Sequence, residues 1–137
     1  MKKKVLFVCT HNSARSQIAE GLLNYFCGGK YEGYSAGSAP TKVNPFSIGV
    51  LNEIGIDITD HYSKSMLEFQ DFKFDYVITV CDNAKETCPF FPGAKEYIHK
   101  SFNDPSSTEG SYEDKPNAFR ETREEIKEWL IEFFCKK

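Results

Sequence analysis

One segment near the N-terminus, residues 5–20, constrains the fold of this chain more than any other. Its sequence, VLFVCTHNSARSQIAE, begins with an apolar run, breaks into small polar residues, and then resumes with apolar residues at helical spacing. This pattern predicts a buried strand, a tight loop and an amphipathic helix. In such a unit, the N–H groups of the loop and the N-terminus of the helix form a cradle for a tetrahedral oxyanion.

The predicted loop also carries reactive side chains. Arg15 falls in the first helical turn, where the helix dipole disfavours a cation unless an anion lies between them. The same dipole and the guanidinium would lower the pKa of the Cys9 thiol. Asn12 tolerates left-handed backbone dihedrals, and Ser16 is placed to donate a hydrogen bond to the thiolate. We interpret this segment as an oxyanion site with a thiol nucleophile; the alternative is a buried cysteine followed by a surface arginine. The residues between Cys9 and Arg15 are Thr10, His11, Asn12, Ser13 and Ala14.

Composition narrows the class of protein. A chain of 137 residues is long enough for one domain, residues 1–137, with a core of its own. A net charge of −3 gives no support for binding to nucleic acid or to an anionic membrane surface. The basic residues 2–4 precede an apolar run that is too short for a signal peptide, and no stretch has transmembrane length. We therefore expect a cytoplasmic protein.

The five cysteines are an odd count without a secretory signal, so a structural disulfide framework is not expected. Cysteines in a reducing compartment are more often catalytic, redox-active or metal-binding. We interpret Cys27, in the last turn of the first predicted helix, as a core or half-buried residue without a function. We interpret Cys135, past the end of the last helix, as inert.

Strands and helices alternate along the chain, which predicts an α/β domain with a short parallel sheet. Ligands in such sheets bind beyond the carboxyl ends of the strands. Cys9 directly follows the first predicted strand and Cys81 the third; if these strands are neighbours, the two thiols meet in one crevice. The predicted helices cover residues 15–27, 44–54 and 117–134, and the predicted strands residues 5–8, 31–37, 75–80 and 96–99. A brief helical turn capped by Ser63 or Ser65, and a polar loop over residues 103–115, complete the prediction.

Cys81 and Cys88 are separated by six residues. This spacing is wrong for a zinc site, which usually places two to four residues between cysteines, and no second pair completes a ligand set. A redox pair is the second interpretation. If the segment were helical, the two Cα atoms would lie about 10.5 Å apart, whereas a disulfide needs roughly 4.4–6.8 Å. The segment would then have to unwind. Two cysteines that merely pack in the core are the third interpretation.

Asp104, followed by Pro105, allows two interpretations. Asp before Pro is common in turns. Alternatively, a loop delivers the Asp104 carboxyl group to the anion site, where it protonates a leaving oxygen as a general acid.

With these residues assembled, the chain resembles the thioredoxin-coupled arsenate reductases built on the low-molecular-weight tyrosine phosphatase fold. The resemblance implies a three-layer α/β domain whose short parallel four-stranded sheet has the order 2-1-3-4, flanked by helices. The motifs that carry it are VCTHNSARSQIAEG at 8–21, YSAG at 34–37, NP at 44–45, GIDI at 55–58, VITVC at 77–81, CP at 88–89 and FNDP at 102–105.

The resemblance also implies a relay of three thiols. The Cys9 thiolate attacks arsenic while the loop and Arg15 hold the oxyanion, and Asp104 protonates the departing oxygen. Cys81 then attacks Cys9, which releases arsenite and leaves a transient Cys9–Cys81 disulfide. Cys88 attacks Cys81 in turn, and thioredoxin reduces the resulting Cys81–Cys88 disulfide. No bound cofactor and no metal are expected; phosphate or sulfate could mimic arsenate, and the protein is expected to be a monomer.

The resemblance further implies that Ser16 adjusts the reactivity of the Cys9 thiol and that Asn12 maintains the conformation of the loop. Some relatives bind a potassium ion at positions that match Asn12, Glu20 and Ser35, together with an aspartate. Lys64 stands at the aspartate position here. We hypothesise that the Lys64 ammonium group replaces the cation beside Glu20.

Two other functions stay open. A low-molecular-weight protein tyrosine phosphatase needs only Cys9, Arg15 and Asp104, and water hydrolyses its phosphocysteine. Such phosphatases usually have aromatic residues after the Asp-Pro pair, where this chain has serines at 106–107, and the later cysteines would have no role. A non-catalytic oxyanion-binding or redox-sensing protein is the second alternative, and it would keep Asp104 for no catalytic reason.

Overall fold

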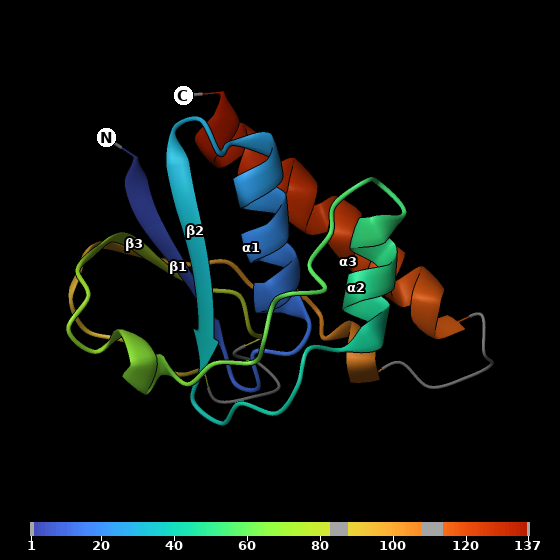
Figure 1. Ribbon diagram of the computed structural model, residues 1–137, viewed down its shortest axis with the longest axis horizontal. Coiled ribbons are helices and arrows are strands. Elements are labelled where there is room, and N and C mark those ends of the chain that lie inside the picture. Colours follow the sequence, from blue (N-terminus) through green and yellow to red (C-terminus); the bar gives the residue numbers. More distant parts are fainter. Residues whose placement is uncertain (1, 83–87, 108–113, 137) are drawn as a thin grey trace.

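The computed structural model describes residues 2–82, 88–107 and 114–136 (Figure 1). In chain order the elements are β1 (Lys3–Cys9), α1 (Arg15–Phe26), β2 (Tyr31–Gly37), α2 (Pro45–Asn52), the 3₁₀ turn η1 (Met66–Phe69), β3 (Phe74–Thr79), β4 (Ala94–His99), the 3₁₀ turn η2 (Pro105–Ser107), α3 (Asp114–Leu130) and the π-helical turn η3 (Ile131–Cys135). Strands and helices alternate from the N-terminus to β3, as the sequence predicts, whereas within the described residues β4 is the next element after β3. Parts of the predicted 81–88 segment and of the predicted 103–115 loop lie outside the described residues.

The four strands form one parallel sheet in the order β2-β1-β3-β4, which confirms the predicted order. β1 lies in the interior of the sheet, where Val5 pairs with Gly33 of β2 and with Tyr76 of β3. Residues 5–9 of β1 are all buried, because both faces of an interior parallel strand are covered.

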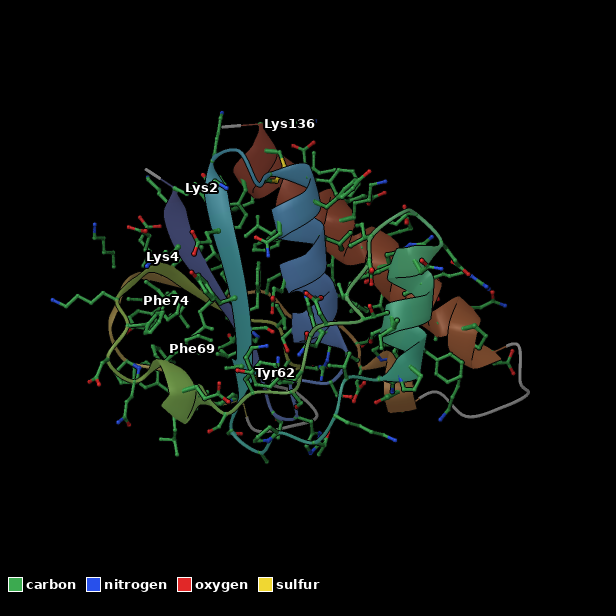
Figure 2. All side chains as sticks on the ribbon, viewed as in Figure 1. Lys2, Lys4, Tyr62, Phe69, Phe74 and Lys136 are labelled. Atoms are coloured by element: carbon green, nitrogen blue, oxygen red, sulfur yellow. A yellow bond between two sulfur atoms is a disulfide. The ribbon has the colours of Figure 1, made fainter. Side chains whose placement is uncertain are left out.

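Helices α1, α2 and α3 lie together on one face of the sheet (Figure 1). Val5 and Phe7 of β1 pack in the core on this side, whereas Leu6 and Val8 belong to a second cluster on the opposite face. This separation follows from the alternation of side chains along a strand. The opposite face is covered by η1 and by aromatic side chains, among them Phe69 and Phe74, whose ring centroids lie 5.8 Å apart (Figure 2).

Local signals account for the element boundaries. The Asn44 side chain accepts a hydrogen bond from the N–H of Phe46 at 2.9 Å and so caps α2, and Pro45 occupies its first position. Ser65, one of the two predicted caps, accepts the N–H of Leu67 and starts η1. α3 begins three residues earlier than predicted. Over the described ranges, no helix has both the length and the apolar character needed to cross a membrane.

Cys27 is buried in the core, as expected, but the expectation that the two remaining cysteines form no structural disulfide is wrong. Cys27, the C-cap of α1, forms a disulfide with Cys135, and their Cα atoms lie 5.3 Å apart. Cys135 lies within the last helical turn of the chain rather than beyond it. The partners are 108 residues apart in sequence, so no local pattern indicates the pairing. It arises because the chain returns along α3 and η3 to the end of α1 (Figure 1).

Candidate active site

The predicted anion loop lies at the carboxyl end of the sheet, between the end of β1 at Cys9 and the start of α1 at Arg15. The end of β2 packs directly against it. A Cβ atom on Gly37 would lie 2.5 Å from the carbonyl oxygen of Thr10 and 2.9 Å from the N atom of Asn12. Only glycine allows this close backbone approach, which explains the glycine that ends the YSAG motif.

Asn12 holds the conformation of the loop through hydrogen bonds on its buried side. It is fully buried, and its φ of +50° lies in the left-handed region, which asparagine tolerates. Its side-chain oxygen accepts hydrogen bonds from Gln17 Nε2 at 2.9 Å and from the backbone N–H of Lys64 at 2.8 Å. Its side-chain nitrogen donates to Ser16 Oγ at 2.8 Å. The loop is therefore tied both to α1 and to the segment after α2.

Cys9 is a free thiol that is 3% exposed, and its sulfur lies 2.9 Å from Ser16 Oγ. Because Ser16 Oγ already accepts a hydrogen bond from Asn12, its own O–H is available to donate to the sulfur. This contact holds the Cys9 sulfur in place at the base of the loop.

Arg15 and Asp104 close the other side of the loop. The Arg15 guanidinium is buried and donates from one terminal nitrogen to the carbonyl oxygen of Phe102 at 3.1 Å. Its second terminal nitrogen lies 3.7 Å from Asp104 Oδ2. Asp104 Oδ1 accepts hydrogen bonds from the N–H of Ser106 at 2.9 Å and from Ser106 Oγ at 2.6 Å. Ser106 thus fixes one carboxyl oxygen and leaves the other facing Arg15.

These residues line a pocket of about 30 Å³. Since one water molecule needs roughly 10–15 Å³ of such volume, the pocket suits a small polar species rather than a bulky ligand. Of the predicted loop residues, Thr10 and Asn12 stay outside the lining. Ser106 is a lining residue that the prediction missed, although Asp followed two residues later by Ser is a recognisable turn signal. The lining consists of Cys9, His11, Ser13, Ala14, Arg15, Asp104 and Ser106.

Cys81 lies beside this pocket through the pairing of β1 and β3. Val8 pairs with Thr79, and the N–H of Val80 donates to the carbonyl oxygen of Val8 at 3.1 Å. β3 ends at Thr79, and Cys81 follows two residues later. Cys9 and Cys81 both belong to the buried core cluster on the helix side of the sheet, so the two cysteines lie at the same end of neighbouring strands.

Cys81 is fully buried and forms a disulfide with the half-buried Cys88. Their Cα atoms lie 5.9 Å apart. Residues 83–87 lie outside the described residues, so the unwinding of that segment stays a prediction, as does the redox role of the pair. The structure thus combines a free Cys9 with a closed Cys81–Cys88 bridge at the same edge of the sheet.

A buried polar network lies behind the anion loop, around Glu20. Ser35 Oγ donates to Glu20 Oε1 at 2.5 Å, and His61 Nε2 lies 3.6 Å from Glu20 Oε2. Lys64 Nζ lies 3.8 Å from Glu20 Oε1 and donates to the carbonyl oxygen of Tyr62 at 2.9 Å. The Lys64 ammonium group therefore supplies a positive charge beside Glu20, where the sequence hypothesis places it.

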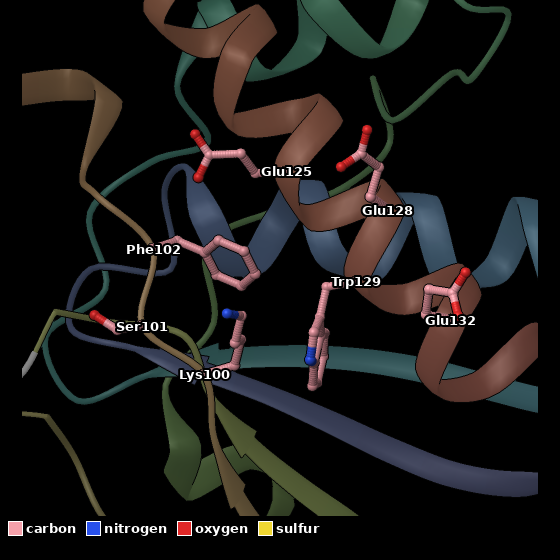
Figure 3. A pocket seen from close by; sticks show the side chains of 7 residues that line it. All are labelled: Lys100, Ser101, Phe102, Glu125, Glu128, Trp129 and Glu132. Atoms are coloured by element: carbon pink, nitrogen blue, oxygen red, sulfur yellow. The ribbon is translucent and has the colours of Figure 1, made fainter.

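A larger hollow of about 380 Å³ lies between the segment after β4 and α3 (Figure 3). It contains no nucleophilic cysteine, but it borders the site, because the Phe102 carbonyl group in its wall binds Arg15. Within residues 2–82, 88–107 and 114–136, no group of three or more His, Cys, Asp or Glu side chains could hold a metal ion. The hollow is lined by Lys100, Ser101, Phe102, Glu125, Glu128, Trp129 and Glu132.

Comparison with known proteins places this architecture in a family. The family model for low molecular weight phosphotyrosine protein phosphatase matches residues 4–137. The chain belongs to this family, as the sequence resemblance indicates.

Relatives of this chain within that group carry the name arsenate reductase. One from Halalkalibacterium halodurans is 42% identical over 125 residues, which cover 91% of this chain and 90% of that protein. A solved arsenate reductase in the phosphate binding state is 30% identical, with a TM-score of 0.82 and 98% of each chain covered. A thioredoxin-dependent arsenate reductase from Corynebacterium glutamicum is also 30% identical, with a TM-score of 0.70; the match covers 99% of this chain and 64% of that one.

Proposed function

We propose that this protein is an arsenate reductase that converts arsenate to arsenite by a three-cysteine relay, with thioredoxin as the reductant. One observation carries the proposal: a free Cys9 in a small anion pocket lies one strand away from the Cys81–Cys88 disulfide. A phosphatase needs only the pocket. The likeness to arsenate reductases over most of the chain supports the same function.

In the first step, the loop N–H groups and Arg15 hold the oxyanion, and the Cys9 thiolate attacks arsenic. A sulfur–arsenic bond forms while an arsenic–oxygen bond breaks, and the oxygen leaves as water after Asp104 delivers a proton. Ser16 orients the attacking sulfur through its 2.9 Å contact. Asp104 is suited to proton delivery because Ser106 fixes one of its oxygens while the other faces the pocket.

In the second step, the Cys81 thiolate attacks the Cys9 sulfur. The Cys9–Cys81 disulfide forms, and the electron pair of the sulfur–arsenic bond reduces arsenic from the +5 to the +3 state, so that arsenite departs. The parallel pairing of β1 with β3, and the burial of both cysteines in one core cluster, support this bond.

In the third step, the Cys88 thiolate attacks Cys81 and releases the Cys9 thiolate. A free Cys9 with a Cys81–Cys88 bridge is the arrangement that this step leaves behind. Because Cys81 is fully buried and Cys88 half-buried, a dithiol reductant of the thioredoxin type reaches Cys88 first. We further propose that the protein acts as a cytoplasmic monomer, that phosphate and sulfate compete with arsenate, and that neither nucleic acid nor membrane is a partner.

The phosphatase alternative keeps one structural argument in its favour. The pocket of Cys9, Arg15 and Asp104 is complete without the two later cysteines. Hydrolysis of an aryl phosphate as a side reaction is therefore compatible with this site. It would leave the closed Cys81–Cys88 bridge without a role.

A coupled assay separates these functions: arsenate-dependent NADPH consumption in the presence of thioredoxin and thioredoxin reductase. For a reductase, Cys9→Ser and Cys88→Ser both abolish turnover, whereas the matched control Cys135→Ser keeps it. A phosphatase instead shows no arsenate turnover, and its Cys88→Ser variant still hydrolyses an aryl phosphate. A sensor shows neither activity. Either of these two outcomes would overturn the proposal.

A further inference from the structure

We propose that Cys27 and Cys135 form a second redox site, which lies outside the thiol relay and whose closure sets the stability of the fold. This inference goes beyond the proposed function and does not depend on it. It rests on the position of the bridge, on the elements that the bridge connects, and on the unequal exposure of its two cysteine residues.

The bridge lies at the end of the molecule opposite the anion pocket. Arg15 begins α1 and Cys27 caps its end, twelve residue steps further on, which corresponds to about 18 Å along a helix. In Figure 1 the end of α1 and the C-terminus lie together at the top, whereas the anion loop lies at the bottom; Lys136 is labelled at the same upper end in Figure 2. Direct thiol exchange between this pair and Cys9 is therefore excluded by distance.

The bridge connects the C-terminal turn η3 to the end of α1. Phe134, next to Cys135, is fully buried, and its ring lies 4.8 Å from that of Tyr31 in β2 and 5.4 Å from that of Tyr76 in β3. Cys27 is the C-cap of α1, and its carbonyl oxygen accepts the N–H of Tyr31 at 3.0 Å. The disulfide thus bonds the end of α1 to the C-terminal turn, and that turn packs on the aromatic cluster at the amino end of the sheet.

The bridge also closes a long loop that contains every element after α1 up to its second partner, since the partners are 108 residues apart. A cross-link of this span removes much of the conformational freedom of the unfolded chain, and its stabilising effect grows with the length of the loop. By comparison, the Cys81–Cys88 bridge has a sequence separation of 7. The bridge outside the active site is therefore the one with the larger effect on stability.

The two cysteines of the bridge differ in exposure. Cys27 is 6% exposed, whereas Cys135 is half-buried. The reduced Cys135 thiolate attacks a low-molecular-weight disulfide, RSSR, forms a mixed disulfide and expels one RSH. Cys27 then attacks the Cys135 sulfur, expels the second RSH and closes the bridge. A dithiol reductant opens the bridge by the reverse exchange, so the site takes small disulfides and dithiols as its redox partners.

The test uses a Cys81→Ser background, in which the bridge between Cys81 and Cys88 cannot form and does not respond to the reductant. After oxidation with a small disulfide, the Cys27–Cys135 peptide should be found by mass spectrometry under non-reducing conditions. The oxidised protein should melt about 10 °C above the reduced protein. The same comparison with Cys27→Ala and Cys135→Ala added should show no redox-dependent shift.

Arsenate turnover is the second readout. In the wild-type background, the Cys27→Ala/Cys135→Ala double variant should keep the turnover of the parent, because neither thiol reaches the pocket. If the double variant fails to fold, Cys135→Ser at the half-buried position serves instead. Absence of the bridged peptide after oxidation, a melting shift that persists without the pair, or loss of turnover in a folded variant would each overturn the proposal.

Discussion

Asn12 supports the anion loop through its side-chain hydrogen bonds and through its left-handed backbone conformation, and two replacements should separate these contributions. Its side chain makes three buried hydrogen bonds, to Ser16, from Gln17 and from the backbone of Lys64. At about 1 kcal/mol for each bond, Asn12→Gly should lower the free energy of unfolding by about 3 kcal/mol. Asn12→Ala loses the same bonds and must also hold φ at +50°, which costs a residue with a Cβ about 1–2 kcal/mol more.

Urea unfolding of the two Asn12 variants measures both contributions. Asn52→Ala, at an exposed position, is the matched control and should change stability by less than about 0.5 kcal/mol. Because Ser16 loses its anchor, kcat/KM for arsenate should also fall by about tenfold in both Asn12 variants. Equal stability of the Gly and Ala variants would refute the backbone argument. A loss of less than about 1 kcal/mol in both would refute the network argument.

Three further predictions follow from individual contacts. Because the Lys64 ammonium group lies 3.8 Å from Glu20, turnover should be the same in potassium chloride as in choline chloride; a several-fold rise with potassium would contradict this. Asp104→Asn should lower kcat for arsenate by at least about 10²-fold and leave thioredoxin reduction of the Cys81–Cys88 bridge unchanged; near-normal kcat would exclude the general-acid role. The backbone N–H of Lys4, bonded to Asp75 at 2.8 Å, lowers the pKa of that carboxyl group. Asp75 therefore stabilises the fold above the ordinary pKa of about 4 and loses this effect as the pH falls through its lowered value. In urea unfolding, Asp75→Asn should cost about 1 kcal/mol at pH 7 and progressively less as the pH falls below about 4; a cost that does not change with pH would contradict this origin.

The fold could be predicted because its signals are local. The apolar run of β1, the cap at Asn44 and the glycine at position 55 each indicate one element boundary within a few residues, and Gly55 does adopt a positive φ of 83°. The alternation of these elements indicates a parallel sheet, which in turn brings the ends of β1 and β3 together. The strand order came from the resemblance to a known family rather than from these signals.

Local sequence signals do not predict which distant residues come into contact. The Cys27–Cys135 pair depends on where α3 ends relative to α1, and an error of one helical residue rotates a side chain by about 100°. Arg15 donates a hydrogen bond to the backbone carbonyl oxygen of Phe102. Because every residue has this group, the identity of residue 102 does not indicate the contact. In the network around Glu20, the family resemblance indicated the place of Lys64 but not the contact of His61 with Glu20. The latter depends on how the segment at 61–64 returns to the loop, which tertiary contacts rather than local propensity decide.

The most direct test of the relay is a single turnover of the Cys88→Ser variant. One equivalent of arsenate is added to the reduced variant, thiols are alkylated after acid quenching, and the peptides are analysed by mass spectrometry without reduction. The relay predicts one equivalent of arsenite and one Cys9–Cys81 disulfide per protein. Arsenite release without that disulfide, or an unreacted Cys9, would contradict the claim that sulfur rather than water resolves the intermediate.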